Sequence, residues 1–217
     1  MIPLSDIDRR PLRLPVITIS IVGLNIIVFL FELMMGKSFI IRWSFIPAEI
    51  AAGKHFTTIL TSLFLHGGFM HIIGNMIYLW AFGPEMEDAM GKYPYLFFYL
   101  AGGILASFAQ VAINPASTIP NLGASGAISA VMGAFLVKFP HDRIRTIIFL
   151  GWFVTISFVP SIVLIGFWFV LQLLSGFGSF VQHQMGGIAY MAHIGGFVFG
   201  MVFGYLFIIF QRHFQNK

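Results

Sequence analysis

Charged residues are scarce in this 217-residue chain, at 9% of the total, and cysteine is absent. A soluble domain carries roughly 25% charged residues, whereas this chain is 58% hydrophobic and contains 26 phenylalanines. A water-soluble fold of this size could not bury so much apolar surface, and a disordered chain would be polar and poor in aromatics. Without cysteine, disulfides, thiolate metal sites and thiol catalysis are excluded. The sequence therefore predicts a multi-pass membrane protein.

The few charges show where helices can cross the membrane, because charge at the bilayer centre is costly. A spanning helix needs about 20 residues, and the charge-free stretches fit one, one, two and two helices along the chain. We therefore expect an all-α bundle of six transmembrane helices, forming a single domain over residues 1–217. The expected helices lie near 14–35, 66–84, 93–113, 124–139, 156–175 and 187–210.

Two further segments and the basic residues complete the expected topology. The long outer loop 36–65 and the apolar lead-in 146–155 are both expected at the membrane interface, although the loop could instead guide something towards the core. Six helices place both termini on one side, with nine lysines and arginines there against three on the other. The positive-inside rule then makes the termini cytoplasmic. No signal-peptide cleavage site precedes the first helix, so we expect that helix to stay in the mature protein.

Several polar residues fall inside the expected helices. His66, His71 and Asn75 open the second helix, Ser125 opens the fourth, and His193 lies near the start of the sixth. These three helices run in the same direction in a six-helix topology. At about 1.5 Å per residue, their first turns share one depth in the outer half of the bilayer. Three separate helices could therefore bring these side chains together.

Each of these residues also has an ordinary interpretation. A serine among glycines and alanines usually packs helices together, and His71 and Asn75, one turn apart, could be polar contacts between helices. The histidines could bind a metal, or form the proton or metal path of a small transporter or channel. The lack of cysteine and of nearby acidic residues argues against a metal site. A net charge of only +4, without a dense basic tract, makes nucleic acid an unexpected partner.

A serine protease would explain more of these residues together. A serine hydroxyl is a weak nucleophile until a base such as histidine takes its proton, and Ser125 and His193 would form that pair if their helices pack closely. Small residues favour such packing, and they recur on both helices: Gly126, Ala130 and Gly133, and Gly196, Gly200 and Gly204. No carboxylate is placed to orient His193, so a dyad is expected. The oxyanion donors would be the side chains of His71 and Asn75 and the Ser125 amide.

At these residues the chain resembles the rhomboid family of intramembrane serine proteases. The motifs are H-G-G-F-M-H-I-I-G-N at 66–75, G-A-S-G at 123–126 and A-Y-M-A-H-I-G-G at 189–196, in the family's order and spacing. The resemblance implies Ser125 as nucleophile and His193 as base, and we expect no metal or cofactor. It also implies that His71, Asn75 and the Ser125 amide serve the oxyanion. Supporting roles fall to His66, Gly123 and Gly196, and Glu87 matches an acidic residue that follows the second helix in many members.

Two departures from the family pattern alter expectations about the surroundings of the site. Thr57 and Thr58 stand where members often carry Trp-Arg, so the outer loop is expected to be anchored differently. Ser129 stands where some members place a tyrosine against the base. The orientation of His193 must then rest on other packing.

The expected function is an endopeptidase of the cell membrane, cutting transmembrane-anchored substrates near the outer face through an acyl-enzyme. The site should open to the extracytoplasmic side through a polar cavity, because water must reach it. The alternatives are the transporter or channel, and an inactive relative that only binds transmembrane segments.

Overall fold

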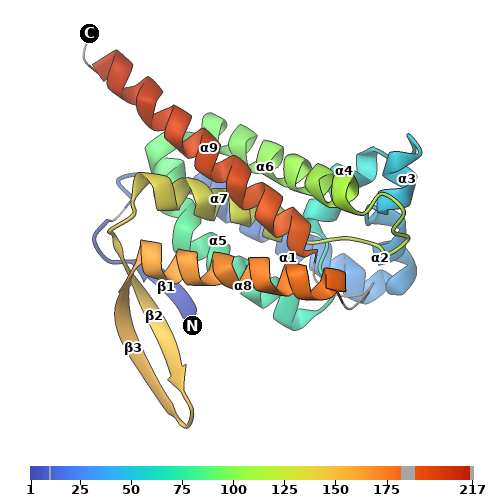
Figure 1. Ribbon diagram of the computed structural model, residues 1–217, viewed down its shortest axis with the longest axis horizontal. Coiled ribbons are helices and arrows are strands. Elements are labelled where there is room, and N and C mark those ends of the chain that lie inside the picture. The colour runs from blue at the N-terminus through green and yellow to red at the C-terminus, as the bar shows by residue number, and fades with distance from the viewer. Residues whose placement is uncertain (10, 182–188, 216–217) are drawn as a thin grey trace.

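The computed structural model describes residues 1–9, 11–181 and 189–215, and helices dominate it (Figure 1). Each predicted helix overlaps an observed one: α1 (Val16–Met35), α5 (Phe69–Met90), α6 (Lys92–Ile113), α7 (Ser125–Lys138), α8 (Ser161–Val181) and α9 (Tyr190–Gln215). The largest shifts are at the ends of α5 and α8, which continue well past the predicted residues 84 and 175. Residues 187 and 188 of the last predicted helix, and Arg10 and Lys217 of the charge count, lie outside the described residues.

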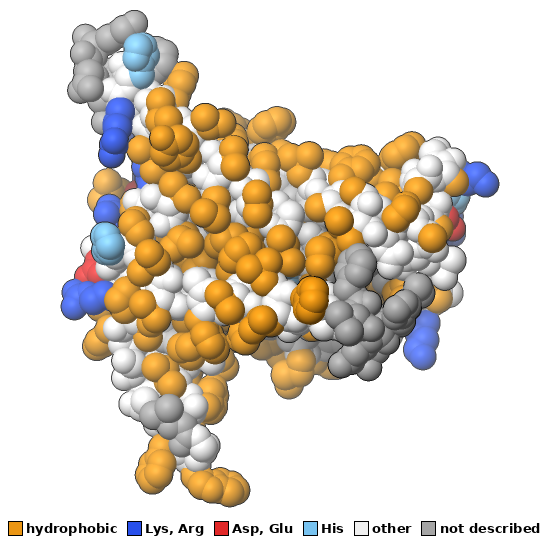
Figure 2. All heavy atoms as spheres, viewed as in Figure 1, with side chains coloured by type: hydrophobic (Ala, Val, Ile, Leu, Met, Phe, Trp, Pro, Cys, Tyr) orange, Lys and Arg blue, Asp and Glu red, His pale blue; other side chains and the backbone are white. Residues whose placement is uncertain are grey.

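Four of the described helices, α1, α6, α8 and α9, are long and apolar enough to cross a membrane. The short helices α4 (Thr57–Thr61) and η1 (Ser62–Phe64) meet α5 at an 89° bend, and together with α5 they would make a fifth span. Figure 2 shows lysine and arginine side chains at the two ends of the visible face, with apolar side chains between them. The chain is a multi-pass membrane protein; the count of six spans and the cytoplasmic termini remain predictions.

Helix α7 lies at the centre of the bundle and contacts α5, α6, α8 and α9. Every residue from Gly126 to Phe135 is buried. A Cβ added to Gly196 of α9 would lie 2.2 Å from the Gly126 carbonyl oxygen, and one added to Gly200 would lie 2.0 Å from that of Ala130. The small residues of α7 and α9 therefore bring the two backbones into direct contact.

A three-stranded antiparallel sheet corrects the all-α prediction. Its strands are β1 (Ile2–Asp6), β2 (Arg143–Leu150) and β3 (Phe153–Pro160), in the order β1-β2-β3. Residues 146–155 thus belong to a hairpin that projects from the bundle (Figure 1), and the helix predicted from residue 156 begins at Ser161. The hairpin is rich in β-branched and aromatic residues, which favour strands. Gly151, with a φ of +62°, supplies the left-handed residue that its two-residue turn needs.

The segment 36–65, predicted as a loop, is folded into α2 (Lys37–Trp43), α3 (Pro47–Ala51), α4 and η1. Phe45, Ile50 and Ile59 are buried together against Val111 of α6. Backbone hydrogen bonds join Phe45 to Asn121 in both directions, and the Gly123 N–H donates to the Ser62 carbonyl at 2.9 Å. These bonds anchor the segment, and they also position the chain that leads into α7.

Two buried carboxylates connect α1 to the rest of the bundle. Glu87 of α5 accepts hydrogen bonds from the Ile17 and Thr18 amides and from the Thr18 hydroxyl, at 2.8–2.9 Å. These amides lie in the first turn of α1, where helical N–H groups lack intrahelical acceptors. Glu32 of α1 accepts the His66 N–H at 2.8 Å. Because Glu87 is buried and hydrogen-bonded, the acidic C-terminal part of α5 packs against α1. This packing explains why α5 continues beyond residue 84, where the sequence predicted that it would end.

Candidate active site

The first turns of α5, α7 and α9 meet at one end of the bundle. Figure 1 shows all three helices starting at the end that carries α2 to α4 and running towards the opposite end of the bundle. Ser125 is the first residue of α7, His71 is the third residue of α5, and His193 is the fourth of α9. The common direction of the three helices places these residues at one level.

Ser125 and His193 are in hydrogen-bond contact. The Nε2 atom of His193 lies 2.7 Å from the Ser125 Oγ, within the range of about 2.6–3.2 Å in which a general base takes a proton. On the other side of the ring, Nδ1 lies 2.8 Å from the Gln172 Oε1. An amide oxygen only accepts, so this contact favours the neutral tautomer with the proton on Nδ1. Nε2 is then free to accept the Ser125 O–H.

His71 approaches the same serine from α5. Its Nδ1 accepts the Gly67 N–H at 3.2 Å, so the proton of the neutral ring lies on Nε2. A Cβ added to Gly123 would lie 2.8 Å from this Nε2 and 3.5 Å from the Ser125 Oγ. Gly123 also has a φ of +126°, which favours glycine. Glycine at this position therefore leaves room for an N–H donor beside the Ser125 hydroxyl.

Asn75 and His66 flank His71. Asn75 is buried one turn further along α5, and its amide NH₂ has no hydrogen-bond partner among the described residues. Leaving a buried donor unpaired lowers the stability of a protein by about 1–3 kcal/mol, so this amide calls for an explanation, and a catalytic role is one. The buried His66 ring packs edge-on against the His71 ring, with centroids 5.1 Å apart. Within the described ranges, no group of three or more His, Cys, Asp or Glu side chains could hold a metal ion.

Comparison with known proteins identifies the family. The Rhomboid domain model matches residues 53–210, a range that includes Ser125, His193, His71 and Asn75. The chain belongs to the rhomboid family.

Three similar proteins are also rhomboids by name. Rhomboid protein 1, mitochondrial, of Saccharomyces cerevisiae is 28% identical over 195 residues, which cover 86% of this chain and 51% of the yeast protein. Rhomboid protease GluP of Bacillus subtilis is 29% identical over 187 residues, or 84% of this chain and 34% of that protein. The human presenilin-associated rhomboid-like protein, mitochondrial, is 35% identical over 96 residues, which cover 43% of this chain and 25% of the human protein. The chain thus spans about half the length of these curated relatives, or less.

Two side chains of α8 contact His193 in this candidate site and were missed from the sequence. Gln172 contacts His193 as described, and the Trp168 ring lies beside the His193 imidazole, with centroids 6.1 Å apart and a 36° tilt. Ser129, at the family's tyrosine position, instead donates to the Ser125 carbonyl at 2.6 Å. The sequence did contain a signal for Gln172, since it is the only amide side chain in α8. Polar groups in membrane helices usually face the bundle interior, so this residue was a candidate for a contact with the site.

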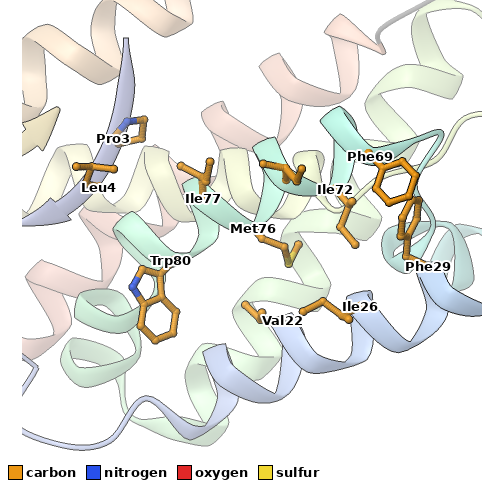
Figure 3. A pocket seen from close by; sticks show the side chains of 11 residues that line it. Pro3, Leu4, Val22, Ile26, Phe29, Phe69, Ile72, Met76, Ile77 and Trp80 are labelled. Atoms are coloured by element: carbon orange, nitrogen blue, oxygen red, sulfur yellow. The ribbon is translucent and has the colours of Figure 1, made fainter. Parts of the chain in front are cut away.

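A cavity of about 540 Å³ lies between α1 and α5 of this rhomboid (Figure 3). Apolar side chains line it, including Phe29, Met76 and Trp80, and neither Ser125 nor His193 does. It is therefore not the polar cavity expected beside the nucleophile, and that cavity remains a prediction.

Proposed function

We propose that this rhomboid is an intramembrane serine endopeptidase that cuts transmembrane-anchored proteins. The observation that carries the proposal is the 2.7 Å contact between the Ser125 Oγ and the His193 Nε2, made by two separate helices. The similarity to a protein named Rhomboid protease GluP supports the same activity. A binding protein would have no use for the polar donors around this serine.

The proposed reaction proceeds through an acyl-enzyme. His193 takes the Ser125 proton at Nε2 as the Oγ attacks a substrate carbonyl carbon. The resulting oxyanion accepts hydrogen bonds from the Ser125 N–H, the His71 Nε2–H and the Asn75 amide. His193 then protonates the leaving amine, and the peptide bond breaks to leave an ester on Ser125. Water, deprotonated by His193, hydrolyses that ester and restores the serine.

The site favours a substrate segment that leaves its helical conformation. Carbonyls of an intact helix are occupied in the hydrogen bonds between residues i and i−4, so a spanning substrate must unwind to offer one to Ser125. The excess of basic residues at the opposite end of the helices supports a site that faces the extracytoplasmic side. The membrane itself we propose to be the cell membrane. Substrates with small or helix-destabilising residues near the cut are expected.

The test is cleavage of a transmembrane substrate, and labelling by a fluorophosphonate probe, with purified protein in liposomes. Ser125→Ala should abolish both, and His193→Ala should lower both by several orders of magnitude, because the two residues act as one unit. Ser129→Ala is the matched control, since the Ser129 hydroxyl donates to the Ser125 carbonyl and not to the Ser125 Oγ. Cleavage that survives in both active-site variants would overturn the proposal. Solute flux without labelling would instead support the transporter alternative.

A further inference from the structure

We propose that Gln172 is a positioning residue, which holds the His193 imidazole in the tautomer and orientation that catalysis needs. The inference rests on the proposed function for its catalytic consequence. Its structural basis is a continuous chain of contacts from Gln172 Oε1 to His193 Nδ1 at 2.8 Å, and from His193 Nε2 to Ser125 Oγ at 2.7 Å. The two contacts use the two nitrogens of one ring.

A neutral imidazole has one N–H, and its partner decides which nitrogen carries it. An amide oxygen at Nδ1 accepts a proton and offers none, so it favours the form with Nδ1–H and an unprotonated Nε2. In the other tautomer, Nδ1 and Oε1 would present lone pairs to each other. That tautomer would also leave Nε2 unable to take the Ser125 proton. Papain-like proteases use an asparagine amide in a comparable role.

Helix α8 presents Gln172 to α9 along a narrow inward stripe. The side chains of Leu164 and Ile165 are buried, and those of Trp168 and Gln172, spaced four residues apart, are half-buried. Trp168 lies beside the His193 ring and Gln172 contacts its edge. The neighbouring Leu173 is 43% exposed on another side of the helix. One turn of α8 therefore supplies both the packing surface and the hydrogen-bond acceptor for the base.

Three variants separate this role from a general effect on α8. Gln172→Leu keeps the size but removes the acceptor, and we expect fluorophosphonate labelling of Ser125 to slow by roughly 10- to 100-fold, as when other orienting partners are lost. With a peptide substrate, kcat should fall while KM stays unchanged, because the inferred role of Gln172 involves no substrate contact. Gln172→Glu keeps an acceptor oxygen and should restore most of the rate. Leu173→Ala is the matched control, and it should be labelled at the same rate as wild type.

A second measurement reads the tautomer directly. In protein labelled with ¹⁵N-histidine, the His193 signals are identified by their loss in His193→Ala, and we expect the Nδ1–H form in wild type. Gln172→Leu should shift the ring towards the Nε2–H form. An Nε2–H ring in wild type, or a folded Gln172→Leu protein labelled within twofold of the wild-type rate, would overturn the inference.

These outcomes are distinct from failure of the proposed function. If the proposed function is wrong, wild-type protein will show neither labelling at Ser125 nor cleavage. The NMR experiment would still report on the contact between Gln172 and His193. If Gln172→Leu lowers the unfolding temperature in detergent, Gln172→Met repeats the test with a more adaptable apolar side chain.

Discussion

Helices α7 and α8 both pack against α9, but they hold it differently. Between α7 and α9 the backbones touch, since an added Cβ on Gly200 would lie 2.0 Å from the Ala130 carbonyl oxygen. Between α8 and α9, at Gly176, the nearest atoms belong to side chains: an added Cβ would first meet the Met191 methyl, at 2.9 Å. Ser125 and His193 thus belong to the tightly packed pair, whereas Gln172 belongs to the helix with the softer contact.

The difference separates two requirements of the site. The distance between Ser125 and His193, the proposed nucleophile and base, depends on how closely α7 and α9 approach, and small residues set that limit. The orientation of the base depends on α8, whose outward sides are exposed over much of its length. The start of α8 is anchored where the Ser161 N–H donates to the Asp142 carbonyl at 2.8 Å, and the Ser161 hydroxyl to the Phe139 carbonyl at 2.5 Å. We therefore expect substitutions in the two contacts to differ in severity.

The largest effect is expected for Gly200→Ala, which breaks the tight contact. The new methyl would overlap the Ala130 carbonyl, and no side-chain rotation can relieve a clash with backbone. Overpacking of this kind typically costs about 1–3 kcal/mol. The unfolding temperature in detergent should fall, and Ser125 labelling should drop more than tenfold as the two helices separate.

Gly166→Ala is the control for that substitution. Gly166 lies in α8 with nothing within 4 Å of an added Cβ, so stability and labelling should match wild type. An equal loss in both variants would show that replacing a helical glycine, and not the backbone contact, causes the effect.

A smaller effect is expected for Gly176→Ala, which tests the softer contact. The Met191 methyl is the far end of a flexible side chain and can move aside, although the Tyr190 Cβ at 3.3 Å leaves little further room. We expect a drop in labelling of less than about threefold and a loss of stability of less than about 1 kcal/mol, below the usual cost of overpacking. A defect as severe as that of Gly200→Ala would contradict the distinction between the two contacts.

The smallest effect on activity is expected at the sheet, which lies at the anchored end of α8. Burial raises the pKa of Asp6 to about 6, and the nearby Asp142 adds to the shift, while hydrogen bonds from the Asp8 and Arg9 amides oppose it. Because this folded-state pKa exceeds the ordinary value of 3.8, the stabilising effect of Asp6 is complete below about pH 4 and is lost as pH rises through 6.

Asp6→Asn tests this pH dependence. The variant should flatten the fall in unfolding temperature between pH 4 and pH 7, and it should leave Ser125 labelling at pH 7 within twofold of wild type. An unchanged pH profile would show that Asp6 does not control it. A large loss of labelling would show instead that the anchored end of α8 influences His193.

The helices and the level of the candidate site residues were predictable because a membrane penalises charge and unpaired polar groups. Gaps between charges located the helices, and the same penalty made Ser125, His71 and His193 conspicuous. The hairpin was missed because residues 146–155 are apolar without regular alternation, and their pairing with β1 joins segments more than 130 residues apart. Gln172 was missed because a single glutamine in an apolar helix does not reveal the direction in which it points.

The sequence by itself determined that this chain is a helical membrane protein with a serine and two histidines at one level. It also placed small residues where two helices could touch, since composition and spacing are local properties. Only the tertiary structure decided that the Ser125 Oγ and the His193 Nε2 lie 2.7 Å apart, and that Gln172 holds the other side of the ring. Hydrogen bonds depend on distances of a few tenths of an ångström, and the packing of whole helices sets those distances.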